Sequence, residues 1–399
     1  MAQWDWLAKP EQPYTWGLAI RVALKATALF VLLNIAFALA TPLPLIGRLS
    51  IYNVLVPGRE RLPYGENPAQ SYNLSPNSLD AMFASHEIAR PKAADEFRVL
   101  LVGDSATWGF LLRPEDTLTG YLDAGGYVTG DGRRMRFYNI GYPIMSLTKD
   151  LLLLDYAMRY EPDLIIWPLT LESFPRGKQL FPPLVQNNAE ATRHLIAAFD
   201  LNLDPDDERF VELDFLDQTI IGRRRELADW LRLQLYGIPW ATTGIDQYYP
   251  ETYEPRQENF DEDVSFQDFA GPQPLTEDEL AFDVLSAGIR RAGDVPVLLI
   301  NEPMFISSGR NSDLRYNFFY PRWAYDAYHE LLLDLADERG WFLLDLWDDI
   351  DPDEFTDSAV HFTPEGAQQY RDQVAPAVLS LINEGRLPGE HAPGPDTRP

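Results

Sequence analysis

Cysteine is absent from this chain, and histidine is scarce. The absence of cysteine excludes disulfides, a thiolate nucleophile and a cysteine-ligated metal ion. The few histidines make the search for a general base short, because imidazole is the side chain that most often moves protons near neutral pH. The candidates are His86, His194, His329, His361 and His391.

Positive charge is also in short supply. The 33 Lys and Arg residues face 61 Asp and Glu residues, which gives a formal net charge of -28 at pH 7. Nucleic acids and anionic membrane surfaces attract fields of Lys and Arg, so we expect neither as a partner for the bulk of this chain. The hydrophobic fraction of 46% over 399 residues is ample for a packed core.

One long apolar run lies near the amino terminus. It extends without a charged residue from Ala26 to Gly47 and is long enough to span a bilayer. We predict a membrane anchor over 19–47, after an amino-terminal tail over 1–18. A cleavable signal peptide is the alternative, because Ala38-Leu39-Ala40 fits the small-x-small cleavage pattern. Basic residues ahead of the run favour a cytoplasmic amino terminus, hence a single-pass protein of the cytoplasmic membrane with an extracytoplasmic domain.

Beyond the anchor, composition divides the chain into three parts. Residues 48–95 are rich in Pro, Asn, Arg and Tyr and are interpreted as a linker, in which His86 is held by local hydrogen bonds. A folded domain is predicted over 96–384. The Pro- and Gly-rich end, 385–399, is predicted to be disordered, which removes His391 from the candidate bases.

Five short apolar runs alternate with helical segments inside the folded domain. Continuous rather than alternating apolar runs are typical of strands covered on both faces, so we predict an α/β fold with a mostly parallel five-stranded sheet between helix layers. An insertion over 174–293 is too long for an ordinary crossover and is predicted to cap the strand ends. The five runs are Val99–Val102, Phe137–Ile140, Leu164–Trp167, Val295–Ile300 and Trp341–Leu346.

The first of these runs ends at Gly103-Asp104-Ser105. Parallel sheets bind their ligands beyond the carboxyl ends of their strands, so a serine there is well placed to act as a nucleophile. The alternative is an ordinary Asp or Ser cap on the helix that follows.

A histidine follows the last predicted strand, at the same edge of the sheet. His361 could accept the proton of Ser105, with Asp357 orienting the imidazole and stabilising the imidazolium. The alternative is a plain helix start, with Thr363 as the cap, Pro364 in the first turn and His361 as a structural residue.

Three motifs together resemble the SGNH (GDSL-type) hydrolase superfamily, over about 97–174 and 294–383. The resemblance implies a flavodoxin-like α/β/α sandwich, Ser105 as the nucleophile, and an oxyanion hole built from the backbone amides of Ser105 and Gly141. It implies no cofactor and no metal. The motifs are Gly103-Asp104-Ser105, Asn139-Ile140-Gly141, and Asp357 to His361 followed by Phe-Thr-Pro-Glu-Gly.

The chain departs from the family pattern at two places. The family's Gly-x-Asn-Asp, whose asparagine donates to the oxyanion, is here Thr170-Leu171-Glu172-Ser173. Because an ionised carboxylate cannot donate, Thr170 or Asn301 are the candidates to replace that donor. The Asp-x-x-His spacing is one residue longer, so that Ser358 stands at the usual position of the acid.

These features predict an extracytoplasmic serine esterase or acyltransferase that acts on O-acyl esters through a Ser-His-Asp acyl-enzyme mechanism. The architecture is similar to that of polysaccharide O-acylation proteins, which work beside a membrane-bound O-acyltransferase. By that likeness the substrate is an acylated cell-envelope glycan. The alternative is a catalytically impaired SGNH-like subunit that binds or scaffolds within a membrane complex.

Overall fold

A computed structural model describes residues 15–56, 59–64, 78–245 and 247–388. Most of the predicted amino-terminal tail (1–18) and of the predicted disordered tail (385–399), including His391, lies outside the described residues.

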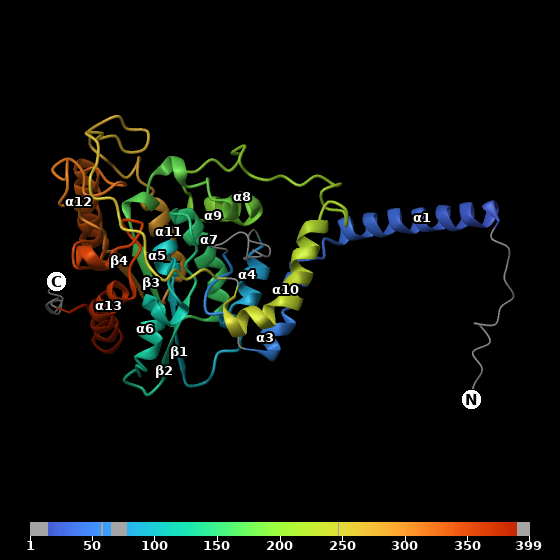
Figure 1. Cartoon of the computed structure of the whole chain (residues 1–399), viewed down its shortest axis with the longest axis horizontal. Helices are drawn as coiled ribbons and strands as arrows, with labels where there is room; N and C mark the ends of the chain where they lie inside the picture. The colour runs from blue at the N-terminus through green and yellow to red at the C-terminus, as the bar shows by residue number, and fades with distance from the viewer. Residues whose placement is uncertain (1–14, 57–58, 65–77, 246, 389–399) are drawn as a thin grey trace, which may run out of the picture.

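The core of the molecule is one five-stranded sheet in which all strands are parallel, in the order β2-β1-β3-β4-β5 (Figure 1). Each predicted apolar run overlaps one strand, which confirms the predicted sheet. The order places β1 in the interior of the sheet, where its carboxyl end is flanked by the ends of β2 and β3. The strands are β1 (Glu96–Leu101), β2 (Arg134–Asn139), β3 (Leu164–Leu169), β4 (Val297–Asn301) and β5 (Phe342–Asp345).

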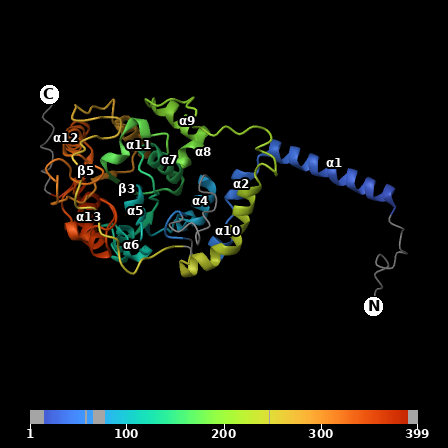
Figure 2. The ribbon, with the colours of Figure 1, turned by 45° about the horizontal axis from the view of Figure 1, so that its top comes forward.

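Helices cover both faces of the sheet and make the α/β/α sandwich that was predicted (Figures 1 and 2). The two faces carry separate cores, and β1 contributes to both: Leu100 joins one, whereas Val99 and Leu101 join the other. The first core packs against α7 (Leu147–Ala157), α11 (Phe282–Ala292) and α12 (Arg322–Arg339), and the second against α6 (Leu118–Ala124) and α13 (Pro364–Glu384).

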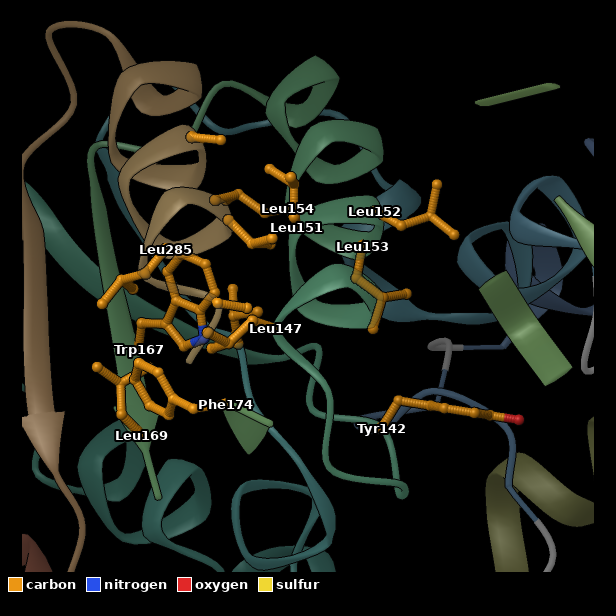
Figure 3. Close-up of a cluster of buried hydrophobic side chains, with 14 of the residues drawn as sticks. Tyr142, Leu147, Leu151, Leu152, Leu153, Leu154, Trp167, Leu169, Phe174 and Leu285 are labelled. Carbon is orange, nitrogen blue, oxygen red and sulfur yellow. The ribbon is translucent and has the colours of Figure 1, made fainter. Parts of the chain in front are cut away.

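The spacing of leucines on α7 explains how this helix covers the sheet. Ser146 caps the helix by accepting a hydrogen bond from the Lys149 amide at 3.3 Å. Leu147, Leu151 and Leu154 recur at helical spacing and lie on the side of Trp167, a fully buried residue of β3 (Figure 3). This packing fixes the loop that leads from β2 into α7, and that loop borders Ser105.

The predicted anchor segment, 19–47, forms two helices. Helix α1 (Trp16–Ala40) is long and apolar enough to cross a membrane and projects away from the rest of the molecule (Figure 1). It ends where Thr41 adopts a left-handed backbone conformation with φ of 38°. Pro42 and Pro44 follow, and the short helix α2 (Leu43–Gly47) contains the second of them.

The described part of the predicted linker, 48–95, packs onto the sandwich. It contains α3 (Ile51–Leu55) and α4 (Leu79–Ser85), whose apolar side chains Leu79, Met82 and Phe83 join the first core. His86 is buried; its Nε2 lies 2.8 Å from the carbonyl oxygen of Asn139, and its Nδ1 accepts a hydrogen bond from the Ile88 amide. Burial lowers the pKa of His86 to about 4, so it is neutral and structural.

One portion of the predicted insertion, 174–293, belongs to the α/β/α sandwich itself. It contains α8 (Pro183–Asn187), α9 (Ala189–Phe199) and α10 (Arg224–Thr243), but also α11, which packs against α7 in the helix layer. The intervening stretches 175–181 and 267–269 contribute to the wall of the cavity that opens at Ser105.

Candidate active site

The candidate nucleophile stands at the start of the short helix α5 (Ser105–Trp108), just after β1. Asp104 caps this helix by accepting a hydrogen bond from the Ala106 amide at 2.8 Å. Gly103 makes the tight entry possible, because a Cβ atom there would lie 2.2 Å from the Thr107 hydroxyl. Ser105 is therefore presented at the carboxyl edge of the sheet by a sharp turn.

The structure brings together Ser105, His361 and Asp357. His361 Nε2 lies 2.9 Å from Ser105 Oγ, and His361 Nδ1 lies 3.1 Å from Asp357 Oδ1. Both distances suit hydrogen bonds, so the imidazole can accept the serine proton at Nε2 while its Nδ1–H donates to the carboxylate. The ring of Phe110 stacks on the imidazole, with centroids 5.0 Å apart, and limits its rotation.

The longer spacing between Asp357 and His361 does not prevent their contact. Ser358, at the position of the usual acid, is buried, and Asp357 supplies the carboxylate instead. Partial burial raises the pKa of the Asp357 carboxyl. The hydrogen bond and charge of His361, helped by the Thr356 hydroxyl, outweigh that effect and hold the pKa below its ordinary value.

The structure differs from the prediction at three of the expected oxyanion donors. The Gly141 amide donates to Asn139 Oδ1 at 3.1 Å, and Gly141 is buried against α5, where a Cβ atom would lie 2.7 Å from the Trp108 amide nitrogen. The Thr170 hydroxyl is buried and forms a hydrogen bond with Tyr320 Oη at 2.6 Å. The Asn301 amide nitrogen donates to Asp345, and its oxygen accepts from Tyr325 and Tyr328. All three groups already have partners in the interior, away from the cavity.

A residue that the sequence reasoning missed, Ile144, lies at the cavity instead. Its φ is +81°, a left-handed conformation that is costly for a β-branched side chain. Neither the Ile144 amide nor the Ser105 amide donates to an acceptor in the described part of the chain, and both residues line the same cavity. Strained backbone conformations of this kind are found most often at functional sites. No sequence signal marks it, because isoleucine is the wrong residue type for the conformation.

Ser105 opens into a cavity of about 540 Å³. Glu172, at the position of the missing asparagine, forms an ion pair with Lys178 and accepts hydrogen bonds from Gln267 at 3.0 Å. The carboxylate thus holds two hydrogen-bond donors in the wall of the cavity. The lining residues are Ser105, Ile144, Met145, Glu172, Pro175, Arg176, Gly177, Lys178, Phe181, Gln267, Asp268, Phe269, Glu279 and Phe319.

A buried lysine ties the two loops of the site together. The Lys149 ammonium group donates to the carbonyl oxygens of Gly103 and Tyr142, each at 2.7 Å, and forms an ion pair with Asp150. Gly103 precedes Ser105 by two residues, and Tyr142 precedes Ile144 by two. Lys149 therefore sets the spacing between the nucleophile loop and the loop that carries the Ile144 amide.

Buried acids lie behind this lysine. Desolvation raises the pKa of the Asp150 carboxyl to about 6 although Lys149 lowers it. Desolvation also raises the pKa of Glu302 well above its ordinary value, and the charges of Asp104 and Asp150 act in the same direction. The Glu302 Oε1 atom is buried without a hydrogen-bond partner. Burial therefore favours the protonated form of Glu302.

The segment after the anchor also supports the nucleophile helix. The Arg61 guanidinium donates to the carbonyl oxygen of Gly109 at 2.7 Å and stacks over the Trp108 ring at 4.0 Å. The Trp108 indole nitrogen donates to the carbonyl oxygen of Leu62 at 2.9 Å. The far end of α5 is held by residues that precede β1 by more than thirty positions.

No protein-family model and no curated protein sequence matches the chain. Similar solved structures include a lipase/acylhydrolase from Enterococcus faecalis, with 15% identity, 74% of this chain and 99% of that chain covered, and a TM-score of 0.36. A carbohydrate acetylesterase from Sinorhizobium meliloti shares 14% identity over 71% of this chain and 99% of its own, with a TM-score of 0.32. An aryl esterase from M. smegmatis shares 13% identity over the same fractions, with a TM-score of 0.32.

Proposed function

We propose that this protein is a membrane-anchored serine esterase or acyltransferase that acts on O-acyl esters of a cell-envelope glycan, with its catalytic domain outside the cytoplasmic membrane. The observation that carries the proposal is the continuous contact from Ser105 through His361 to Asp357, at the carboxyl edge of a parallel sheet and beside a cavity. A Ser-His-Asp arrangement of this kind performs acyl transfer on several unrelated folds.

In the proposed mechanism, Ser105 Oγ attacks the acyl carbonyl carbon while His361 Nε2 takes the hydroxyl proton. Asp357 holds the imidazole in the required tautomer and stabilises its positive charge. The Ser105 and Ile144 amides donate to the oxygen of the tetrahedral intermediate. His361 then returns the proton to the leaving alcohol, and the acyl-enzyme is resolved by water or by a sugar hydroxyl.

The composition of the cavity wall favours a hydroxyl-rich substrate. Charged and amide side chains supply donors and acceptors along one part of the wall, among them Glu172, Lys178 and Gln267. Aromatic and aliphatic side chains complete it, and such mixed walls suit the polar edge and apolar face of a sugar ring. In this proposal a membrane-bound O-acyltransferase supplies or receives the acyl group.

The test is covalent labelling of the detergent-solubilised chain with a fluorophosphonate probe. We expect wild type to be labelled and Ser105→Ala to remain unlabelled. Equal labelling of the two, or no labelling of wild type, contradicts a serine nucleophile and favours the binding or scaffold alternative. A matched control is Ser358→Ala, which leaves the three contacting residues in place and should label as wild type does.

A second measurement separates transfer from hydrolysis. The acyl content of the cell-envelope glycan is compared between a deletion strain and the same strain complemented with wild type or Ser105→Ala. A fall on deletion that only wild type restores supports transfer, and a rise that only wild type reverses supports deacylation. An unchanged acyl content contradicts the proposed substrate class.

A further inference from the structure

An extended apolar surface surrounds the base of α1. Its exposed side chains come from the segment 213–221, from α2 and α3 with the residues between them, and from the outer side of α10; we call this surface the collar. Val54 is 82% exposed and Leu216 is 71% exposed. Soluble surfaces rarely gather so many large apolar side chains. The collar residues are Leu213, Phe215, Leu216, Ile221, Leu45, Leu49, Ile51, Val54, Leu55, Leu231, Leu235 and Ile238.

The collar is continuous with α1, because one of its residues is hydrogen-bonded to Asn34, near the carboxyl end of the helix. The Ile221 amide donates to Asn34 Oδ1 at 3.2 Å, and Asn34 Nδ2 donates to the carbonyl oxygen of Phe30. Asn34 and Ala38 are the only residues of α1 that are buried. The segment 213–221 therefore lies beside the last turns of the apolar helix.

The depth of this contact follows from helix geometry. Asn34 precedes the end of α1, Ala40, by six residues, which at about 1.5 Å per residue corresponds to about 9 Å along the axis. Once α1 crosses a membrane, the segment at Ile221 lies about that far below the end of the spanning helix. Ile221 is then at a depth where lipid, rather than water, surrounds it.

The rest of the collar is fixed rigidly to this contact. Trp230 Nε1 and Gln234 Nε2 of α10 both donate to the carbonyl oxygen of Leu49, and Gln234 Oε1 accepts from the Ile51 amide at 2.7 Å. Tyr52 packs against Leu233 and Trp240 in a small core of its own. Figure 1 shows α10 beside α3, and Figure 2 shows α10 beside α2, next to the base of α1. The outer sides of these helices thus form one surface.

The charge of the collar edge differs from that of the chain as a whole. Arg224 and Arg225 are exposed at the start of α10, and the side chains of Arg48 and Arg232 are 60% and 50% exposed. Basic residues that border an apolar surface suit the anionic headgroups above a hydrocarbon layer. Arg48 is paired with Asp80 and Arg232 with Asp229. Over 43–55, 213–221 and 224–243 four arginines balance four acidic residues, whereas the chain as a whole has a net charge of -28.

We propose that the collar is embedded in the lipid bilayer, so that the domain lies on the membrane surface rather than hanging from α1 alone. The bound chemistry is acyl chains against the apolar side chains and lipid phosphates against the arginines at the edge. The inference rests on the membrane placement of α1 proposed above and is independent of the ester chemistry. It also makes α1 a retained helix, because cleavage after Ala40 removes Asn34 from Ile221.

The absence of cysteine allows a direct test on the full chain, with one cysteine introduced at a time and labelled with an environment-sensitive fluorophore. The two test sites are Leu216→Cys and Val54→Cys. Phe30→Cys on α1 serves as the membrane control, and Val128→Cys, an exposed site near the start of β2, as the aqueous control. Circular dichroism first shows that each variant is folded. Each is then reconstituted alone into phosphatidylethanolamine–phosphatidylglycerol vesicles.

Quenching by nitroxide-labelled lipid and by aqueous iodide gives the readout. We expect the Leu216 and Val54 probes to behave as the Phe30 probe does: strong quenching by the lipid nitroxide and an iodide quenching constant several-fold below that of Val128. If both test probes match Val128 while Phe30 is in lipid, the collar is not lipid-bound and a membrane-protein partner is the better occupant. If iodide also quenches the Phe30 probe as strongly as the Val128 probe, both the lipid-bound collar and the membrane placement of α1 are wrong. Neither result affects the labelling of Ser105, so the ester chemistry is judged separately.

Discussion

His361 Nε2 lies 2.9 Å from Ser105 Oγ although 256 positions separate the two residues in the chain. They meet because β1 and β5 are parallel strands of one sheet, and the segments that follow both strands leave at the same edge. Substitutions of the residues around these two side chains can therefore test the proposed chemistry.

The first prediction concerns the carboxylate that orients His361. Asp357→Asn keeps the shape of the side chain but removes the charge that stabilises the imidazolium. In a buried triad this change costs about 10⁴-fold in kcat. The Asp357 side chain is 34% exposed, so water screens part of its charge and we expect a smaller loss, on the order of 10²-fold.

The measurement is the rate of hydrolysis of an activated aryl ester at saturating substrate. Ser358→Ala is the matched control, since Ser358 occupies the usual position of the acid, and it should retain the wild-type rate. A large loss in the Ser358 variant with none in Asp357→Asn would mean that the loop rearranges before catalysis.

The second prediction concerns Lys149 as a positioning residue. Lys149→Met removes the donor shared by Gly103 and Tyr142 and leaves Asp150 buried without its ion pair, a change that typically costs 3–5 kcal/mol of unfolding free energy. The double variant with Asp150→Asn removes the buried charge and should recover much of that loss. It should not recover kcat, because the loops that carry Gly103 and Tyr142 still lack the hydrogen bonds from Lys149. A double variant as stable as wild type and fully active would exclude the positioning role.

The third prediction concerns the backbone of Ile144. Ile144→Gly removes the steric cost of the left-handed conformation but increases the entropy of the unfolded chain. We expect a net gain of about 0.5–1 kcal/mol in unfolding free energy, seen as a higher melting temperature, because the side chain is 41% exposed and makes few contacts to lose. Activity should persist, since glycine retains the amide. A markedly less stable variant would show that the isoleucine side chain, and not the loop, fixes this conformation.

The fourth prediction concerns pH. The Glu302 carboxyl titrates near 4.5 in the unfolded chain, but burial raises its pKa well above that value in the folded state. Above pH 4.5 the native state thus holds a proton that the unfolded state has lost. Its contribution to stability falls as pH rises, by up to about 1.4 kcal/mol per pH unit until the folded pKa is reached.

Glu302→Gln removes this proton linkage while keeping the shape of the side chain. The melting temperature of wild type relative to the variant should therefore fall as the pH rises above about 4.5. Parallel curves for the two proteins above that pH would contradict a raised pKa of Glu302.

The sheet was predictable because its strands are buried on both faces and therefore appear as unbroken apolar runs. The positions of Ser105 and His361 followed from the same rule, since parallel strands end at one edge. The donors were not predictable. Whether an amide is free depends on which side chain reaches it, and the bond between Gly141 and Asn139 and the conformation of Ile144 are set by tertiary packing rather than by residue type.

The region between the anchor and the sheet was interpreted as a linker because Pro, Asn and Arg are common there. Its few apolar residues proved sufficient to bury α4 in the core, and Arg61 and His86 join it to α5 and β2 through bonds to backbone carbonyls. Composition records how polar a segment is on average, whereas burial depends on where its few apolar residues fall.

The hydrogen bonds that join Arg61 and Leu62 to the end of α5 limit how far this protein can be shortened. A chain that starts at β1 contains the whole sheet and all three residues Ser105, Asp357 and His361, yet it lacks the groups that hold Trp108 and the carbonyl oxygen of Gly109. Such a fragment would leave a fully buried indole exposed on one side, three residues from the nucleophile. The smallest catalytically competent unit therefore begins before Arg61, well upstream of the first strand.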